Sequence, residues 1–193
     1  MNKAERTRKF IIEKSASIIN RKGMAGTSLS DIMEATKLAK GGIYGNFESK
    51  DEICVASFLY LTEKLADQLN RAVLRGGTAK EKFLNLLDAY TEIQNTEGGC
   101  PILNFGVESD DTHPNMKEYV KKAIRSSQKR FFDIISDGIA HHEISATVNP
   151  KNFSIKVFAM IEGAILFRRV LESDEQMRII HEAIKLEFES YLI

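Results

Sequence analysis

Apolar residues recur along this chain with the spacing of amphipathic helices, and no segment alternates steadily between apolar and polar residues. Gly23, Gly76-Gly77 and Pro114 interrupt the pattern where helices are expected to end or begin. The pattern therefore predicts an all-α fold. The expected helices cover about residues 3–22, 28–36, 40–46, 49–75, 79–95, 114–141, from 150 onward, and 175–193, with a short apolar segment at 100–107.

Charge is unevenly distributed along a chain whose formal net charge is zero. Residues 1–50 carry 10 Lys and Arg against 5 Asp and Glu, whereas residues 51–193 carry 17 against 22. A basic segment followed by an acidic one favours contact between the first and a polyanion, although chance could also produce this difference.

Composition also argues against a secreted, disulfide-rich protein and against a membrane protein. Two cysteines do not make a secreted disulfide framework, and the N-terminal stretch is charged too often for a signal peptide. The longest apolar stretch, residues 157–167, is interrupted by Glu162 and is too short to cross a bilayer. We expect a cytoplasmic protein with reduced thiols and no membrane partner.

Two short helices joined by a tight turn within the basic segment are typical of a helix-turn-helix, which lays its second helix in the major groove of DNA. Such a helix would use Gly41-Gly42 to bring its backbone close to the DNA. Lys40, Tyr44 and Asn46 would reach bases or phosphates, and Lys50 would hold a phosphate at the start of the next helix. The alternative is that the glycines form a helix-start turn and that Tyr44 packs in the core.

The segment from Gly23 to Ile53 resembles the DNA-binding domain of the TetR family of bacterial transcriptional regulators. The residues that carry the resemblance are Thr27-Ser28, Asp31-Ile32 with Ala35, Lys40-Gly41, Tyr44, Phe47 and Ser49-Lys50-Asp51-Glu52. The resemblance implies a helix-turn-helix domain over residues 1–48 and a helical effector-binding and dimerisation domain over residues 49–193. It implies DNA contacts by Thr27, Ser28, Ala39, Lys40, Gly41, Gly42, Tyr44, Asn46 and Lys50.

Three positions depart from the family pattern. Lys37 stands where the turn usually has glycine, Ala39 stands where the second helix usually has a Ser or Thr cap, and Gly45 replaces a larger residue. Either Lys37 adopts a left-handed conformation at a cost of about 1–2 kcal/mol, or the turn differs. Which bases or phosphates are contacted at these three positions is not carried over from the family, so the operator sequence is not predicted.

The helix after Pro150 is apolar around most of its circumference, which favours burial on more than one side. With the last helix it could form a four-helix bundle in a two-fold dimer, as in the TetR family, or it could be the central helix of a monomer. A dimer implies a pseudo-palindromic operator. The predicted interface consists of Phe153, Val157, Met160, Ala164, Phe167, Ile180, Ile184 and Phe188.

The family resemblance also implies a pocket for a small-molecule effector, and composition suggests that this effector is apolar or mixed in character. Aromatic and polar residues interleave on the middle helices, although each fits an ordinary core as well. The candidate pocket residues are Phe58, Tyr90, Cys100, Asn104, His113 and Phe131. No cofactor is expected.

Cys100, flanked by Gly98-Gly99 and Pro101, allows a second hypothesis. Near a helix N-terminus its thiol would become reactive and could sense oxidants or electrophiles, whereas a buried thiol would only fill the core. An enzyme using Cys100 and His113 lacks any supporting motif. A metal site at Asp110, Asp111 and His113 has too few ligands, and His141-His142 fits a helix end better. We therefore predict a homodimeric, effector-released repressor, with a redox sensor or a non-specific DNA-binding protein as alternatives.

Overall fold

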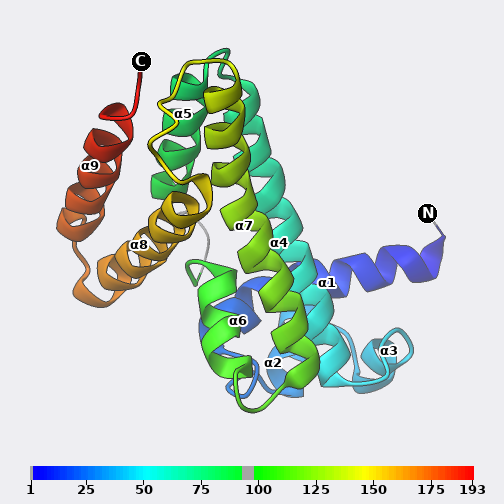
Figure 1. The fold of residues 1–193 in the computed structure, drawn as a ribbon. Helices are drawn as coiled ribbons and strands as arrows, with labels where there is room; N and C mark the ends of the chain where they lie inside the picture. Colours follow the sequence, from blue (N-terminus) through cyan, green and yellow to red (C-terminus); the bar gives the residue numbers. More distant parts are fainter. Residues whose placement is uncertain (1, 93–97) are drawn as a thin grey trace. The chain divides into compact units, whose positions relative to one another are not determined.

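The computed structural model of the chain describes residues 2–92 and 98–193, and Figure 1 shows the course of the chain. The described residues confirm the predicted all-α fold, with one isolated antiparallel bridge between Ile144 and Leu192 and no longer strand pairing among them. The helices are α1 (Lys3–Lys22), α2 (Leu29–Thr36), α3 (Lys40–Tyr44), α4 (Lys50–Leu74), α5 (Ala79–Thr91), α6 (Pro101–Ser109), α7 (Pro114–Ala140), α8 (Pro150–Leu171) and α9 (Glu175–Glu189).

Local sequence signals explain most helix ends. Gly23 closes α1 at φ 82°, a conformation that glycine adopts without steric cost. Asn149 caps α8 through Asn152 N–H, and Pro150 occupies the first turn. The short apolar segment expected at 100–107 is α6, which continues to Ser109 and thus includes Glu108, beyond the expected end. The end expected for α5 near Asn95 lies outside the described residues.

The described chain divides into two compact units. The first contains residues 2–65 and 98–121, and the second contains residues 66–92 and 122–193. This division by packing does not coincide with the domain boundary expected between residues 48 and 49, which stays a prediction. In the part of the chain that the structure describes, no helix has the length and hydropathy of a membrane span.

The core of the first unit is built from one apolar face of each helix. Ile11 of α1, Ile32 of α2, Ile43 of α3 and Phe58 of α4 are at most 1% exposed. Phe58 packs against Phe105 of α6 with 5.2 Å between ring centroids. Helix α6 therefore shares a core with the helices that precede it by more than forty residues.

Aromatic rings form the core of the second unit. The Phe83 ring stacks on Phe188 at 3.8 Å and lies 5.5 Å from Phe131 and 6.0 Å from Phe153. Helix α9 packs against α8 and α5, as Figure 1 shows. Because Phe153 and Phe188 come from α8 and α9, the inner faces of both helices are used within the chain itself.

Candidate nucleic-acid interface

The turn between α2 and α3 contains two residues that are unfavourable for its backbone conformation or for helix capping. Lys37 adopts the left-handed conformation, with φ 57° and ψ 24°, so the first of the two expected alternatives is the one found. Ala39 precedes α3 as an extended N-cap residue whose side chain makes no capping hydrogen bond. Packing holds the turn instead, because Ile32 and Ile43 on its two sides are completely buried.

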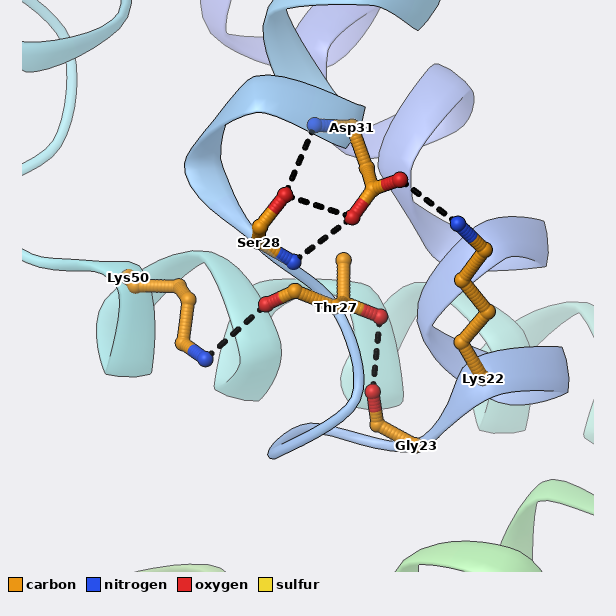
Figure 2. A network of polar contacts seen from close by, with 6 residues as sticks. All are labelled: Lys22, Gly23, Thr27, Ser28, Asp31 and Lys50. Carbon is orange, nitrogen blue, oxygen red and sulfur yellow. Dashed lines mark hydrogen bonds and ion pairs between the residues drawn. The ribbon is translucent and has the colours of Figure 1, made fainter.

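A polar network fixes the start of α2 (Figure 2). Ser28 Oγ accepts a hydrogen bond from Asp31 N–H at 3.1 Å, and Asp31 Oδ2 accepts one from Ser28 N–H at 2.8 Å, which confirms the expected capping box. Lys22 Nζ, at the end of α1, lies 2.6 Å from Asp31 Oδ1. The Lys22 ammonium, followed by hydrogen bonds from Ser28, holds the pKa of Asp31 well below its usual range.

We expect Asp31→Asn to make stability less sensitive to acid. Because the pKa of Asp31 is lower in the folded chain, its carboxylate stabilises the fold above about pH 4, and this contribution is lost as pH falls toward the folded-state pKa. Between about pH 6 and pH 2.5, the thermal midpoint of the wild type should fall further than that of Asp31→Asn. Glu34→Gln, a change at an exposed site on α2, is the control, and an equal fall in Asp31→Asn and the wild type would contradict the account.

Helix α3 exposes the residues predicted to meet DNA and buries its opposite side. Lys40, Gly41 and Gly42 are exposed, and Tyr44 is 40% exposed, so the alternative that places Tyr44 in the core is not what the structure shows. Lys40 Nζ lies 5.8 Å from the centroid of the Tyr44 ring. Asn46 Nδ2 donates to Gly42 O at 2.9 Å, so its amide also supports the end of the helix.

The fold itself does not require glycine at positions 41 and 42. A Cβ added to Gly41 would meet no atom within 4 Å, and one added to Gly42 would make ordinary contact with Leu38 at 3.6 Å. Neither residue has a positive φ. The missing side chains leave the α3 backbone bare on the exposed side, where a DNA groove could approach it.

Thr27, Ser28 and Lys50 have structural partners in this structure. Thr27 is buried and its Oγ1 donates to Gly23 O at 2.7 Å, while Ser28 caps α2. Lys50 Nζ donates to Met24 O at 2.7 Å and to Thr27 O at 2.9 Å. Its ammonium thus holds the α1–α2 loop, and the phosphate contact expected for Lys50 stays a prediction.

Replacing Lys50 by methionine should lower the free energy of unfolding by about 1–2 kcal/mol, because two charge-assisted hydrogen bonds to carbonyls are lost at a partly buried site. Chemical denaturation measures this directly. Lys14→Met removes the same charge from an exposed position on α1 and serves as the control. Unchanged stability in Lys50→Met would show that the two hydrogen bonds are unimportant.

Comparison with known proteins supports the interpretation of these helices. A sequence model described as bacterial regulatory proteins, tetR family, matches residues 11–56, and one described as the tetracyclin repressor-like C-terminal domain matches residues 77–184. This chain belongs to the TetR family. It is a helix-turn-helix transcriptional regulator, and the family consists of regulators rather than enzymes.

Solved structures of TetR-family proteins match the whole chain. A TetR-family regulator from Cytophaga hutchinsonii is 35% identical, with a TM-score of 0.93 over 100% of this chain and 98% of that one. A TetR regulator from Chloroflexus aurantiacus is 32% identical, with a TM-score of 0.95 over the same shares. The regulator TtgR of Pseudomonas putida is 23% identical over 168 residues, which are 84% of this chain and 80% of that protein.

The residues predicted to line a TetR effector pocket fall into both units. Phe58, Cys100, Asn104 and His113 belong to the first unit, while Tyr90 and Phe131 pack together in the second at 5.8 Å. Asn104 Nδ2 donates to Gly98 O and to Asn20 O, so this side chain anchors α6. The second unit contains a cavity of about 510 Å³, which is lined by the end of α4, the start of α5 and the end of α7. None of the six predicted pocket residues lines this cavity.

Five of the eight predicted dimer residues are buried within the chain. Phe153, Val157, Ala164, Ile184 and Phe188 are at most 4% exposed, so they line the inner faces of α8 and α9. Of the other three, Met160 and Ile180 are half-buried and Phe167 is 52% exposed. A further apolar set on the same helices is exposed and follows helical spacing. It consists of Ile155, Ala159, Leu166 and Val170 on α8, and Ile179, Ala183 and Leu186 on α9.

Neither cysteine is joined in a disulfide, and both are buried. Burial, the largest cause, raises the pKa of Cys54 to about 11, so its thiol stays protonated near neutrality. Cys100 does occupy the N-terminal end of α6, as the sensor hypothesis requires, but only 1% of it is exposed. Asp110 pairs with Lys117 at 2.7 Å, and the described residues contain no group of three metal-ligating side chains.

Arg8 is a structural residue that no sequence motif indicated. Its guanidinium donates to Asn46 O and to Glu52, 2.7 Å away, and it lies 4.1 Å above the Phe47 ring. Arg8 thereby links α1 to the end of α3 and the start of α4. Arg8 lies 38 to 44 residues before these partners in the sequence, so local spacing cannot predict the contacts.

Proposed function

We propose that this chain is a homodimeric, sequence-specific repressor that a small-molecule effector releases from a palindromic operator. The observation that carries the proposal is the exposed face of α3, where Lys40, two bare glycines and Tyr44 lie beside one another above a buried Ile43. A helix of this kind can enter the major groove, with Lys40 reaching base edges or phosphates and the Tyr44 hydroxyl donating to a phosphate. Thr27, Ser28, Ala39, Asn46 and Lys50 complete the proposed contact set.

The exposed apolar stripes of α8 and α9 support the dimer. Val170 is 70% exposed and Leu186 is 59% exposed, and each lies in line with other apolar residues of its helix. Contiguous exposed apolar surface is typical of protein–protein interfaces. A two-fold dimer presents two copies of α3, which explains why the operator should contain two related half-sites.

The effector site is proposed from membership in the family and from composition. Tyr90 and Phe131 are buried in the aromatic core of the second unit and stay candidates. The cavity of about 510 Å³ in that unit, which other residues line, lies within the usual size range of small-molecule sites. Phe58, Cys100, Asn104 and His113 of the first unit stay candidates as well. We place the protein in the cytoplasm, with the chromosome.

Sensing through Cys100 remains the second candidate. The position of Cys100 at the N-terminal end of α6 favours it. Treatment with a thiol-reactive electrophile should then release DNA from the wild type and not from Cys100→Ser. Equal release, or none, from both proteins would remove this candidate.

The proposal is tested by titrating the protein into labelled DNA from its own upstream region, with scrambled DNA as the control, at several salt concentrations. We expect saturable binding of two chains per site and a steep dependence on salt. Equal affinity for both DNAs, followed by failure to select any sequence from a random library, would favour a non-specific DNA-binding protein.

A further inference from the structure

The loop between α1 and α2 is held by a carboxylate from α6. Glu108 Oε2 accepts a hydrogen bond from Met24 N–H at 2.6 Å, and Glu108 Oε1 accepts one from Ala25 N–H at 2.5 Å. The approach is close, since a Cβ added to Gly23 would lie 3.0 Å from Glu108 Oε2. A side chain more than eighty residues away in sequence thus binds the loop that leads into the helix-turn-helix.

The same loop is held by a positive charge from α4. Lys50 Nζ donates to the carbonyls of Met24 and Thr27, so the backbone of Met24 is bound through its N–H by α6 and through its C=O by α4. Immediately after this loop, Ser28 and Asp31 cap α2, and Asp31 pairs with Lys22 (Figure 2). The position at which the chain enters α2 is therefore fixed from three other helices.

Helix α6 is itself anchored in the first unit. Asn104 Nδ2 donates to Asn20 O and Asn20 Oδ1, each at 3.0 Å, and Asn20 Nδ2 donates to Gly99 O at 3.0 Å. Asn20 is 2% exposed, so these bonds are shielded from water. Together with the packing of Phe105 on Phe58, they hold the backbone that carries Glu108.

We propose that Glu108 is a positioning residue for DNA recognition: by binding the amides of Met24 and Ala25 it sets the entry of α2, and through the α2–α3 turn the orientation of α3. This inference rests on the proposed function. The DNA-reading module therefore extends beyond the helix-turn-helix to α6, and operator affinity depends on a residue that does not touch DNA.

Charge effects and positioning predict opposite results for Glu108→Gln. Removing a negative charge from a DNA-binding protein should raise its affinity for all DNA, because repulsion by phosphates decreases. Glutamine, however, can accept only through its carbonyl oxygen and turns its NH2 group toward one of the two loop amides. Positioning by Glu108 therefore predicts weaker operator binding. Glu63→Gln, at an exposed position on α4, removes the same charge without touching the loop.

The test measures dissociation constants for a selected operator and for scrambled DNA, together with hydrogen exchange of the Met24 and Ala25 amides. For Glu108→Gln we expect operator affinity about tenfold lower, scrambled-DNA affinity not reduced, and faster exchange of both amides. Glu108→Asp, which keeps the charge but shortens the reach, should show a smaller loss in the same direction and replaces Glu108→Gln if that variant does not fold. Glu63→Gln should bind the operator at least as tightly as the wild type.

The outcomes separate this inference from the function on which it rests. A purely structural role would lower thermal stability and leave the ratio of operator to scrambled affinity unchanged, which overturns the positioning role while the repressor function stands. A wild type that does not distinguish operator from scrambled DNA would overturn both.

Discussion

Replacing Gly41 by leucine is expected to weaken operator binding by about a hundredfold while leaving the fold intact. A side chain at this position points into open space in the isolated chain, since an added Cβ meets nothing within 4 Å. In the complex it would stand between the α3 backbone and the DNA. Loss of two base or phosphate contacts at about 1–3 kcal/mol each accounts for the magnitude.

Stability should change in the opposite direction at the same site. Alanine is favoured over glycine within helices by up to about 1 kcal/mol, so Gly41→Ala should raise the free energy of unfolding while it also weakens DNA binding. Ala140→Leu adds comparable bulk to an exposed helical position in the second unit and should leave DNA binding unchanged. Operator binding by Gly41→Leu that equals the wild type would show that α3 does not approach DNA through its glycines.

Leu166→Glu is expected to convert a dimer into monomers at micromolar concentration. Leu166 lies within the exposed apolar stripe of α8. In a two-fold dimer each chain would add one negative charge to the interface, and neither charge would have a positive partner there. Because each monomer can hold only one half-site, operator affinity should fall by about a hundredfold or more. Sedimentation equilibrium and DNA titration measure the two effects.

Leu74→Glu is the matched control for this variant. Leu74 is 82% exposed at the end of α4 and belongs to neither apolar stripe, so the same substitution there should preserve the oligomeric state. A dimer that persists in Leu166→Glu would move the interface to another surface of the chain.

Local rules predicted the helices well because their signals lie within a few residues of each end. Gly23, Ser28 with Asp31, and Asn149 with Pro150 each determine a boundary through their own backbone or side chain. The fixed spacing of residues from Thr27 to Glu52 identified the helix-turn-helix equally well. It covers the start of α2, the turn, α3 and the start of α4.

Periodicity could not decide which apolar face of α8 points inward. The stripe through Phe153 and Val157 was predicted to meet a partner, yet it packs against Phe83 and α9, and the stripe through Ile155 and Leu166 is exposed. A helix that is apolar on several sides gives the same sequence signal whichever side is covered by its own chain.

Long-range polar contacts were also beyond local inference. Lys50 was expected to bind phosphate from its place at a helix start, but its ammonium reaches loop carbonyls more than twenty residues earlier in the chain. Glu108, near the end of α6, follows the apolar segment expected at 100–107 and binds amides more than eighty residues away. Such pairs depend on how helices pack, which spacing within one helix does not encode.

The most direct test of the central claim, that a dimer of this chain reads DNA through α3, is selection of binding sequences from a random duplex library by the wild-type protein. The account predicts an enriched inverted repeat whose half-sites lie about one helical turn or more apart, and loss of that enrichment with Gly41→Leu. Enrichment of no sequence, or of an unrepeated sequence bound equally well by Gly41→Leu, would contradict it.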